Sequence, residues 1–129
     1  MNKIKTVIEQ MALEALCDDA IVELYSAVEY YPEWPDVLYP ADSLAEVEAQ
    51  LNRARFNNES KDGCTGYSIF GEEYMEFLEA ALIGNRELAR RELVQTIAML
   101  LRIGCHLDDY VKKVETGNSK LETGEVGNG

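Results

Sequence analysis

Residues 69–103 read IFGEEYMEFLEAALIGNRELARRELVQTIAMLLRI. Apolar residues recur at helical spacing on both sides of Gly84-Asn85. A glycine favours the end of one helix and an asparagine favours the start of the next. The stretch therefore predicts a tight helical hairpin, with helices over about 69–83 and 86–113 and a weak point at Gly104.

The segments before this hairpin also favour helices. Residues 3–31 hold neither proline nor glycine, and their apolar spacing fits one long helix or two short ones separated at Cys17-Asp18-Asp19. Three prolines within residues 32–40 exclude a helix interior there. Ser43 and Glu46 have the spacing of a capping box, so a further helix is expected from there to about residues 57–58, followed by a loop to residue 68.

The pattern as a whole predicts an all-α fold, a bundle of about four helices. No segment alternates apolar and polar residues as a half-buried strand does. We expect one domain over residues 1–115, with residues 3–31 as an extra N-terminal helix. The glycine-rich residues 116–129 are expected to form a disordered tail.

Composition narrows the classes of function. The 129 residues include 24 acidic and 12 basic ones, which gives a net charge of −12. That charge argues against direct binding to nucleic acid or to an anionic membrane. Three widely spaced cysteines provide no disulfide framework and no metal-binding pair. With no signal peptide and no long apolar run, the protein is expected to be soluble and cytoplasmic.

Helical wheels place a few carboxylates on the apolar side of the hairpin. Glu73 falls inside the apolar arc of the first helix and Glu76 falls at its edge, whereas Glu72 and Glu79 fall on the solvent side. In the second helix Glu92 falls among apolar residues, with Gln95 at the edge of that sector. Each arm of the hairpin therefore directs a carboxylate and a second polar group toward the core.

Two facing carboxylates in a core repel each other and are costly to bury. A divalent cation bound between them relieves both costs, and hard oxygen ligands of this kind suit Mg²⁺. The alternative is that Glu73 and Glu92 form ion pairs with arginines such as Arg53, Arg55 or Arg90.

The same residues resemble a known family. Glu73-Tyr74-Met75-Glu76 followed by the glycine turn and Glu92-Leu93-Val94-Gln95 is similar to the MazG-like all-α nucleoside triphosphate pyrophosphohydrolases, in particular their short phage-type members. The family signature is ExxE on one helix and ExxD on the next, so Gln95 departs from it. The resemblance is firm over residues 69–103 and faint over 43–56, and the matching core spans about residues 42–112.

The resemblance implies Mg²⁺-dependent hydrolysis of a nucleoside triphosphate to the monophosphate and pyrophosphate, with Mn²⁺ as a possible substitute. It implies Glu73, Glu76 and Glu92 as catalytic residues and metal ligands, Gln95 as a weaker ligand, and a homodimer or homotetramer as the assembly.

Other side chains are candidates for contacts to the nucleotide. Candidate cations for the phosphates are Lys61, Arg53, Arg55 and Arg90. Aromatic candidates for stacking on the base are Tyr67, Tyr74, Phe56 and Trp34. The single histidine, His106, has no ligating neighbours in the sequence and is expected to be structural or exposed.

A second hypothesis is a catalytically inactive acidic helical protein that mimics DNA or inhibits a partner protein. A mimic needs regularly spaced exposed carboxylates, whereas an enzyme needs carboxylates that converge inward. A plain structural helical module is a third interpretation.

Overall fold

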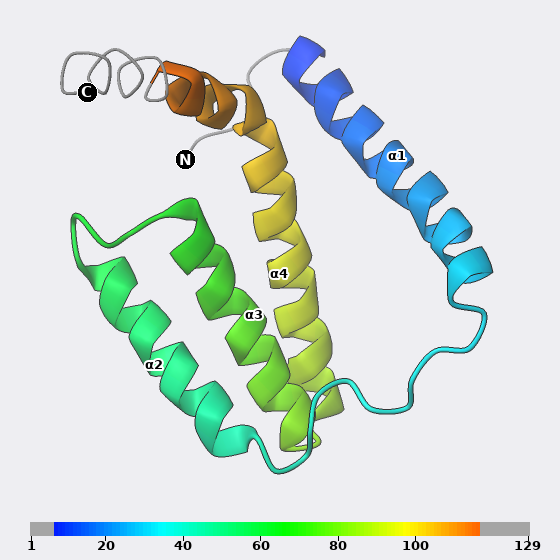
Figure 1. Ribbon diagram of the computed structural model, residues 1–129, viewed down its shortest axis with the longest axis vertical. Coiled ribbons are helices and arrows are strands. Elements are labelled where there is room, and N and C mark those ends of the chain that lie inside the picture. The colour runs from blue at the N-terminus through cyan, green and yellow to red at the C-terminus, as the bar shows by residue number, and fades with distance from the viewer. Residues whose placement is uncertain (1–6, 117–129) are drawn as a thin grey trace, which may run out of the picture.

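The computed structural model describes residues 7–116, and this part of the chain is helical throughout its regular structure (Figure 1). The helices are α1 (Val7–Tyr30), α2 (Leu44–Glu59), α3 (Gly66–Leu82) and α4 (Arg86–Cys105). A further helical segment covers residues 107–116, and the described residues contain no strand. The all-α prediction is confirmed. None of the helices within residues 7–116 has the length and apolar character needed to cross a bilayer.

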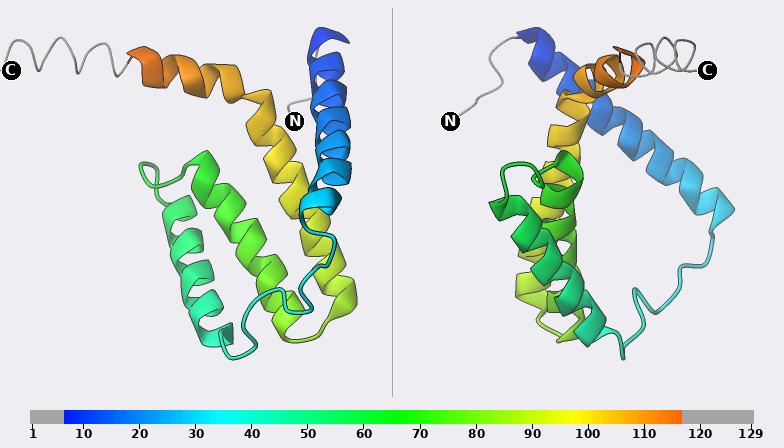
Figure 2. Two further views of the ribbon diagram at one scale, coloured as in Figure 1. Left: turned by 45° about the vertical axis from the view of Figure 1, so that its right-hand side comes forward. Right: turned by 60° about the vertical axis from the view of Figure 1, so that its left-hand side comes forward.

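The helices form an open row in the order α2, α3, α4, α1. α3 packs between α2 and α4, while α1 contacts α4 alone among the described helices (Figures 1 and 2). Fully buried apolar side chains lie only on α2 and α3 in this part of the chain, at Val47, Leu51, Leu78 and Ala80. The core is therefore small and sits at the α2 side of the row.

The predicted hairpin turn is present. Gly84 has a φ of +79°, a conformation that glycine adopts without strain. The amides of Gly84 and Asn85 donate to the carbonyl oxygens of Ala81 (3.1 Å) and Ala80 (3.0 Å), which closes α3. The Asn85 side chain accepts a hydrogen bond from the Leu88 amide at 3.1 Å, which caps α4. This turn fixes how α3 and α4 face each other.

The caps of α2 and α3 differ from expectation. α2 begins where predicted, but the Ser43 side chain makes no cap hydrogen bond, so the predicted capping box is wrong. The capping box lies instead at α3, which begins at Gly66 rather than at Ile69. There the Ser68 amide donates to Thr65 Oγ1 (3.0 Å) and the Thr65 amide donates to Ser68 Oγ (2.8 Å).

At α1 the structure decides between the two alternatives, and at α4 it differs from the prediction. α1 runs without interruption through Cys17-Asp18-Asp19, so it is one long helix. α4 ends at Cys105 rather than near Lys113, because the chain bends at His106 before the helical segment 107–116. Gly104 lies beside the bend, and a Cβ there would collide with Leu16 of α1. Apart from residue 116, the expected disordered tail lies outside the described residues.

Two glycine substitutions test the role of the turn. Gly84→Ala forces a side chain into a left-handed conformation, and we expect it to destabilise the fold by about 1 kcal/mol. Gly71→Ala lies inside α3, where a Cβ meets no atom within 4 Å. Because alanine favours helix, it should stabilise by roughly 0.5–1 kcal/mol. Urea denaturation measures the change in the free energy of unfolding for both variants. Equal changes of the same sign would contradict the role given to Gly84 in the turn.

Candidate metal and triphosphate site

The packing of α3 on α4 brings three carboxylates together. Glu73 and Glu76 of α3 and Glu92 of α4 each offer an oxygen, and these oxygens all lie within 4.8 Å of one another. Glu92 is only 9% exposed, while Glu73 and Glu76 are half-buried. The helical wheels therefore placed all three on the correct side of the hairpin. We refer to these three residues as the carboxylate cluster.

Gln95 completes the cluster from the exposed side. With its amide nitrogen turned toward the acids, Gln95 Nε2 donates to Glu73 Oε2 at 2.9 Å and to Glu92 Oε2 at 3.0 Å. One amide thereby links the carboxylates of α3 and α4. The opposite end of the same amide is a carbonyl oxygen, which is a suitable ligand for a hard cation.

The cluster alters the acidity of its members. Burial raises the pKa of Glu73, and the charges of Glu92 and Glu72 add to this effect. Burial also raises the pKa of Glu76, to about 7, together with a hydrogen bond to Glu92 and the charges of Glu73 and Glu92. Arg55 acts on Glu76 in the opposite direction. At Glu76, burial and the neighbouring carboxylates together thus outweigh the opposing effect of Arg55.

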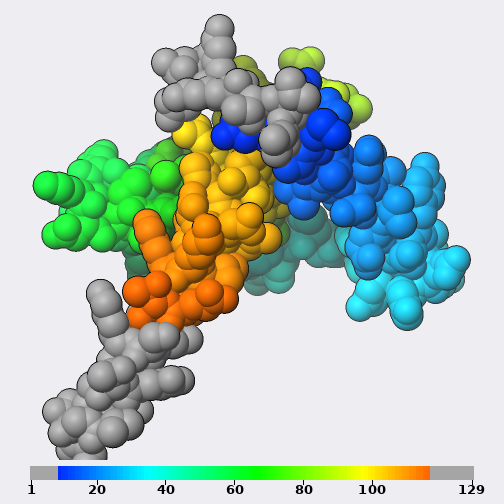
Figure 3. Space-filling view, turned by 90° about the horizontal axis from the view of Figure 1, so that it is seen from above, coloured from blue at the N-terminus to red at the C-terminus, as the bar shows by residue number. Residues whose placement is uncertain are grey.

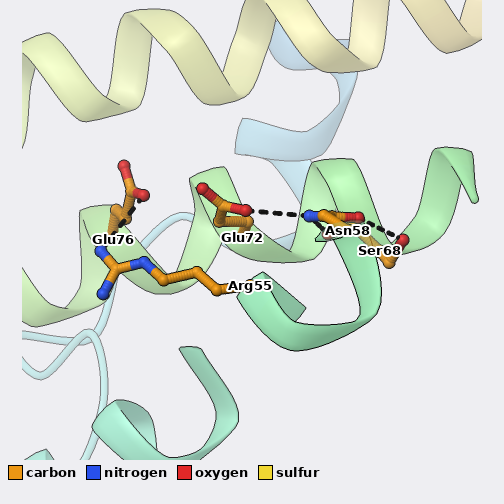
Figure 4. Close-up of polar contacts among 5 residues, drawn as sticks. All are labelled: Arg55, Asn58, Ser68, Glu72 and Glu76. Carbon is orange, nitrogen blue, oxygen red and sulfur yellow. Dashed lines mark hydrogen bonds and ion pairs between the residues drawn. The ribbon is translucent and has the colours of Figure 1, made fainter. Parts of the chain in front are cut away.

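That positive charge comes from α2. Arg55 Nη2 lies 3.4 Å from Glu76 Oε1 (Figure 4). It is the only arginine or lysine that forms an ion pair with the cluster within residues 7–116. Arg55 was among the arginines considered for pairing, but it contacts Glu76 and not Glu73 or Glu92. Its side chain is 47% exposed, so the pair is partly screened by water.

A hydrogen-bonded group next to Arg55 holds α2 against α3. Asn58 Nδ2 donates to Glu72 Oε1 (2.9 Å) and to the Ser68 carbonyl oxygen (3.0 Å), and Ser68 Oγ donates to Asn58 Oδ1 at 2.6 Å (Figure 4). Glu72, expected on the solvent side, is therefore half-buried and bonded to α2. The contact could not be predicted because the wheel of one helix does not show where its neighbours lie.

The other predicted binding residues lie elsewhere. Arg53, Lys61 and Arg90 are all exposed, and within the described chain none of them forms an ion pair. The structure does not bring these three to the cluster. Among the aromatic candidates, Phe56 is 73% exposed, and Tyr74 stacks on Phe70 with ring centroids 5.7 Å apart.

A cavity of about 290 Å³ opens one helical turn from the cluster. Ile69 precedes Glu73 by one turn on α3, and Met99 follows Gln95 by one turn on α4. The lining residues are Gly66, Ile69, Met99, Arg102, Ile103, His106 and Tyr110. The sequence offered no signal for His106 and Tyr110, because their position depends on the bend after α4.

Comparison with known proteins does not assign this chain to a family. No protein-family model, no curated protein and no solved structure matches this chain. The resemblance to MazG-like pyrophosphohydrolases therefore stays a prediction from the sequence motif.

The donor set fits a hard divalent cation. Three converging carboxylates and one amide oxygen are ligands that Mg²⁺ or Mn²⁺ accepts. A bound cation would favour the charged carboxylates, which burial and their mutual repulsion disfavour at Glu73 and Glu76. The cluster is open to solvent on the side where the exposed Gln95 lies. A substrate could therefore bind the same cation from this side.

The acidity of Glu76 predicts how stability depends on pH without metal. Its pKa of about 7 in the folded protein lies above the ordinary 4.5. The folded state binds this proton more tightly than the unfolded state, so the contribution is complete below about pH 4.5 and is lost as the pH rises through about 7. Between about pH 5 and about pH 8, Tm of the wild type should fall roughly 3–5 °C more than Tm of Glu76→Gln.

The measurement is thermal unfolding by circular dichroism in the presence of a chelator. Glu48→Gln on the exposed side of α2 is the matched control and should keep the wild-type slope. If Tm of Glu76→Gln and Tm of the wild type depended on pH in the same way, the pKa of Glu76 would not be raised in the folded protein.

Proposed function

We propose that the protein hydrolyses a nucleoside triphosphate, in the ribo or deoxyribo form, to the monophosphate and pyrophosphate with Mg²⁺ as cofactor and Mn²⁺ as a substitute. The observation that carries the proposal is the convergence of Glu73, Glu76 and Glu92 between α3 and α4. The motif that contains them resembles the metal-binding signature of the MazG-like family. An enzyme acting on this substrate is expected in the cytoplasm.

The residues of the site have distinct tasks. Glu73, Glu76 and Glu92 would hold the cation, and Gln95 would turn its carbonyl oxygen toward it. When bound, Mg²⁺ neutralises the triphosphate and stabilises charge that develops on its oxygens during transfer. A carboxylate of the cluster accepts the proton of the attacking water. Arg55, released from Glu76, would contact a phosphate oxygen.

The cavity beside the cluster has a size and position that suit the nucleoside. Its apolar walls and the rings of His106 and Tyr110, whose centroids are 6.1 Å apart, offer surfaces for a base. One helical turn, about 5.4 Å, separates this cavity from the cluster along both helices. A nucleoside held in this cavity would therefore direct its phosphates toward the carboxylates.

The direct test is release of pyrophosphate from each common ribo- and deoxyribonucleoside triphosphate with Mg²⁺. We expect turnover of at least one substrate, and a loss of at least about 100-fold in Glu73→Gln and Glu92→Gln, because each substitution removes a charge needed at the cluster. Glu79→Gln, on the same helix outside the cluster, is the control and should stay active.

Turnover that survives in Glu73→Gln and Glu92→Gln would contradict the proposed site. No pyrophosphate from any nucleotide, together with no change in Tm on adding Mg²⁺, would overturn the enzyme and favour the acidic binding protein.

A second experiment separates the cavity from the cluster. Met99→Trp fills the cavity, so KM for the nucleotide should rise by roughly tenfold, whereas the increase in Tm caused by Mg²⁺ alone should stay as in the wild type. Met99→Leu conserves the volume and serves as the control. His106→Ala tests the same surface without adding bulk. An unchanged KM in a folded Met99→Trp variant would place the base elsewhere.

A further inference from the structure

Most apolar side chains of α1 are exposed within the described chain. No residue of α1 whose burial is described, from Glu9 to Tyr30, is buried. In its second half Ile21, Leu24, Tyr25 and Val28 are each more than half exposed. Seen from above, this part of α1 projects away from the other helices (Figure 3). A long helix with so little burial gains almost no stability from packing in a single copy.

The outer face of α4 has a matching apolar stripe. Leu93, Ile97 and Leu100 follow one another at spacings of four and three residues and are 39–49% exposed. The next position of the same stripe is Gly104, where Leu16 of α1 makes its close approach. The uncovered stripe is therefore a direct continuation of the existing α1–α4 contact. Within one chain α1 diverges from α4 before it reaches the stripe (Figures 1 and 2).

The charges of the two surfaces are complementary. α1 carries six carboxylates and neither lysine nor arginine. Toward the start of α4 the stripe continues into Arg90 and Arg86, and neither of these forms an ion pair within residues 7–116. An acidic apolar helix and an apolar stripe that ends in arginines have the chemistry to pack together.

We propose that two copies of this chain pair through α1 and α4. The second half of α1 of one copy covers the stripe Leu93–Ile97–Leu100 of its partner, with the α1 carboxylates near Arg86 and Arg90, and the contact is repeated about a two-fold axis. Both surfaces belong to the same chain, which is why a second copy fits better than another partner. The acidic surface of α1 disfavours an anionic lipid surface.

This pairing also completes the row of helices. Among the described helices, none closes the row from α1 back to α2, and a second row placed against α4 and α1 supplies the missing layer. Glu92 belongs to the side of α4 that packs against α3, about 100° around the helix from Leu93, and is not part of the stripe. The pairing is therefore independent of the proposed function and leaves the carboxylate cluster accessible.

The mass of the full chain in solution tests the proposal. Light scattering after size-exclusion chromatography should give about twice 14.5 kDa for the wild type. Tyr25→Asp and Ile97→Asp, on the two sides of the contact, should each raise the dissociation constant by about tenfold or more and shift the mass toward one chain. Phe56→Asp introduces the same charge at an exposed aromatic of α2 and should stay paired.

Hydrogen exchange of the wild type keeps the test independent of how the variants fold. Protection of residues 21–28 and 93–100 should increase as the protein concentration rises through the dissociation constant. A wild type of one-chain mass at all concentrations would overturn the proposal. An assembly that persists in both aspartate variants would overturn it as well.

Discussion

The structure depends on the contact between α3 and α4 across Glu73, Glu76 and Glu92. Three acids whose oxygens lie within 4.8 Å of one another oppose the packing of the helices that carry them. One half-exposed arginine and one amide offset this repulsion only in part, and burial together with the neighbouring carboxylates raises the pKa of Glu76 to about 7. The close approach of the three carboxylates therefore lowers the stability of the fold, and such a local loss of stability is typical of a site that binds a cation.

The rest of the chain positions that contact. The Gly84-Asn85 turn sets the facing of α3 and α4, and it thereby decides which carboxylates meet. On the other side, Asn58 joins α2 to the first turns of α3, and Arg55 reaches Glu76 from the same helix. α2 thus holds α3 and Glu76 in position. The bend at His106 brings His106 and Tyr110 to the cavity that lies one helical turn from the carboxylate cluster.

The features that could be predicted from the sequence are those that depend on residues close together in the chain. Helical periodicity gave the all-α class, glycine and asparagine chemistry gave the hairpin turn, and the wheels placed Glu73 and Glu92 inward. The failures concern neighbours in space. The absent side-chain cap of α2, the hydrogen-bonded Glu72 and the bend at His106 depend on tertiary contacts, and the pattern of a single helix does not contain that information. The open order of the row could not be predicted for the same reason.

The central claim is that the carboxylate cluster binds a divalent cation, and a crystal of the full chain soaked in Mn²⁺ tests it most directly. An anomalous difference peak between Glu73, Glu76 and Glu92, with the Gln95 carbonyl oxygen turned toward it, is the expected result. The same soak of a Glu92→Gln crystal should lose that peak. A map with manganese only at surface carboxylates, and with the Gln95 amide nitrogen still donating to Glu73 and Glu92, would contradict the claim.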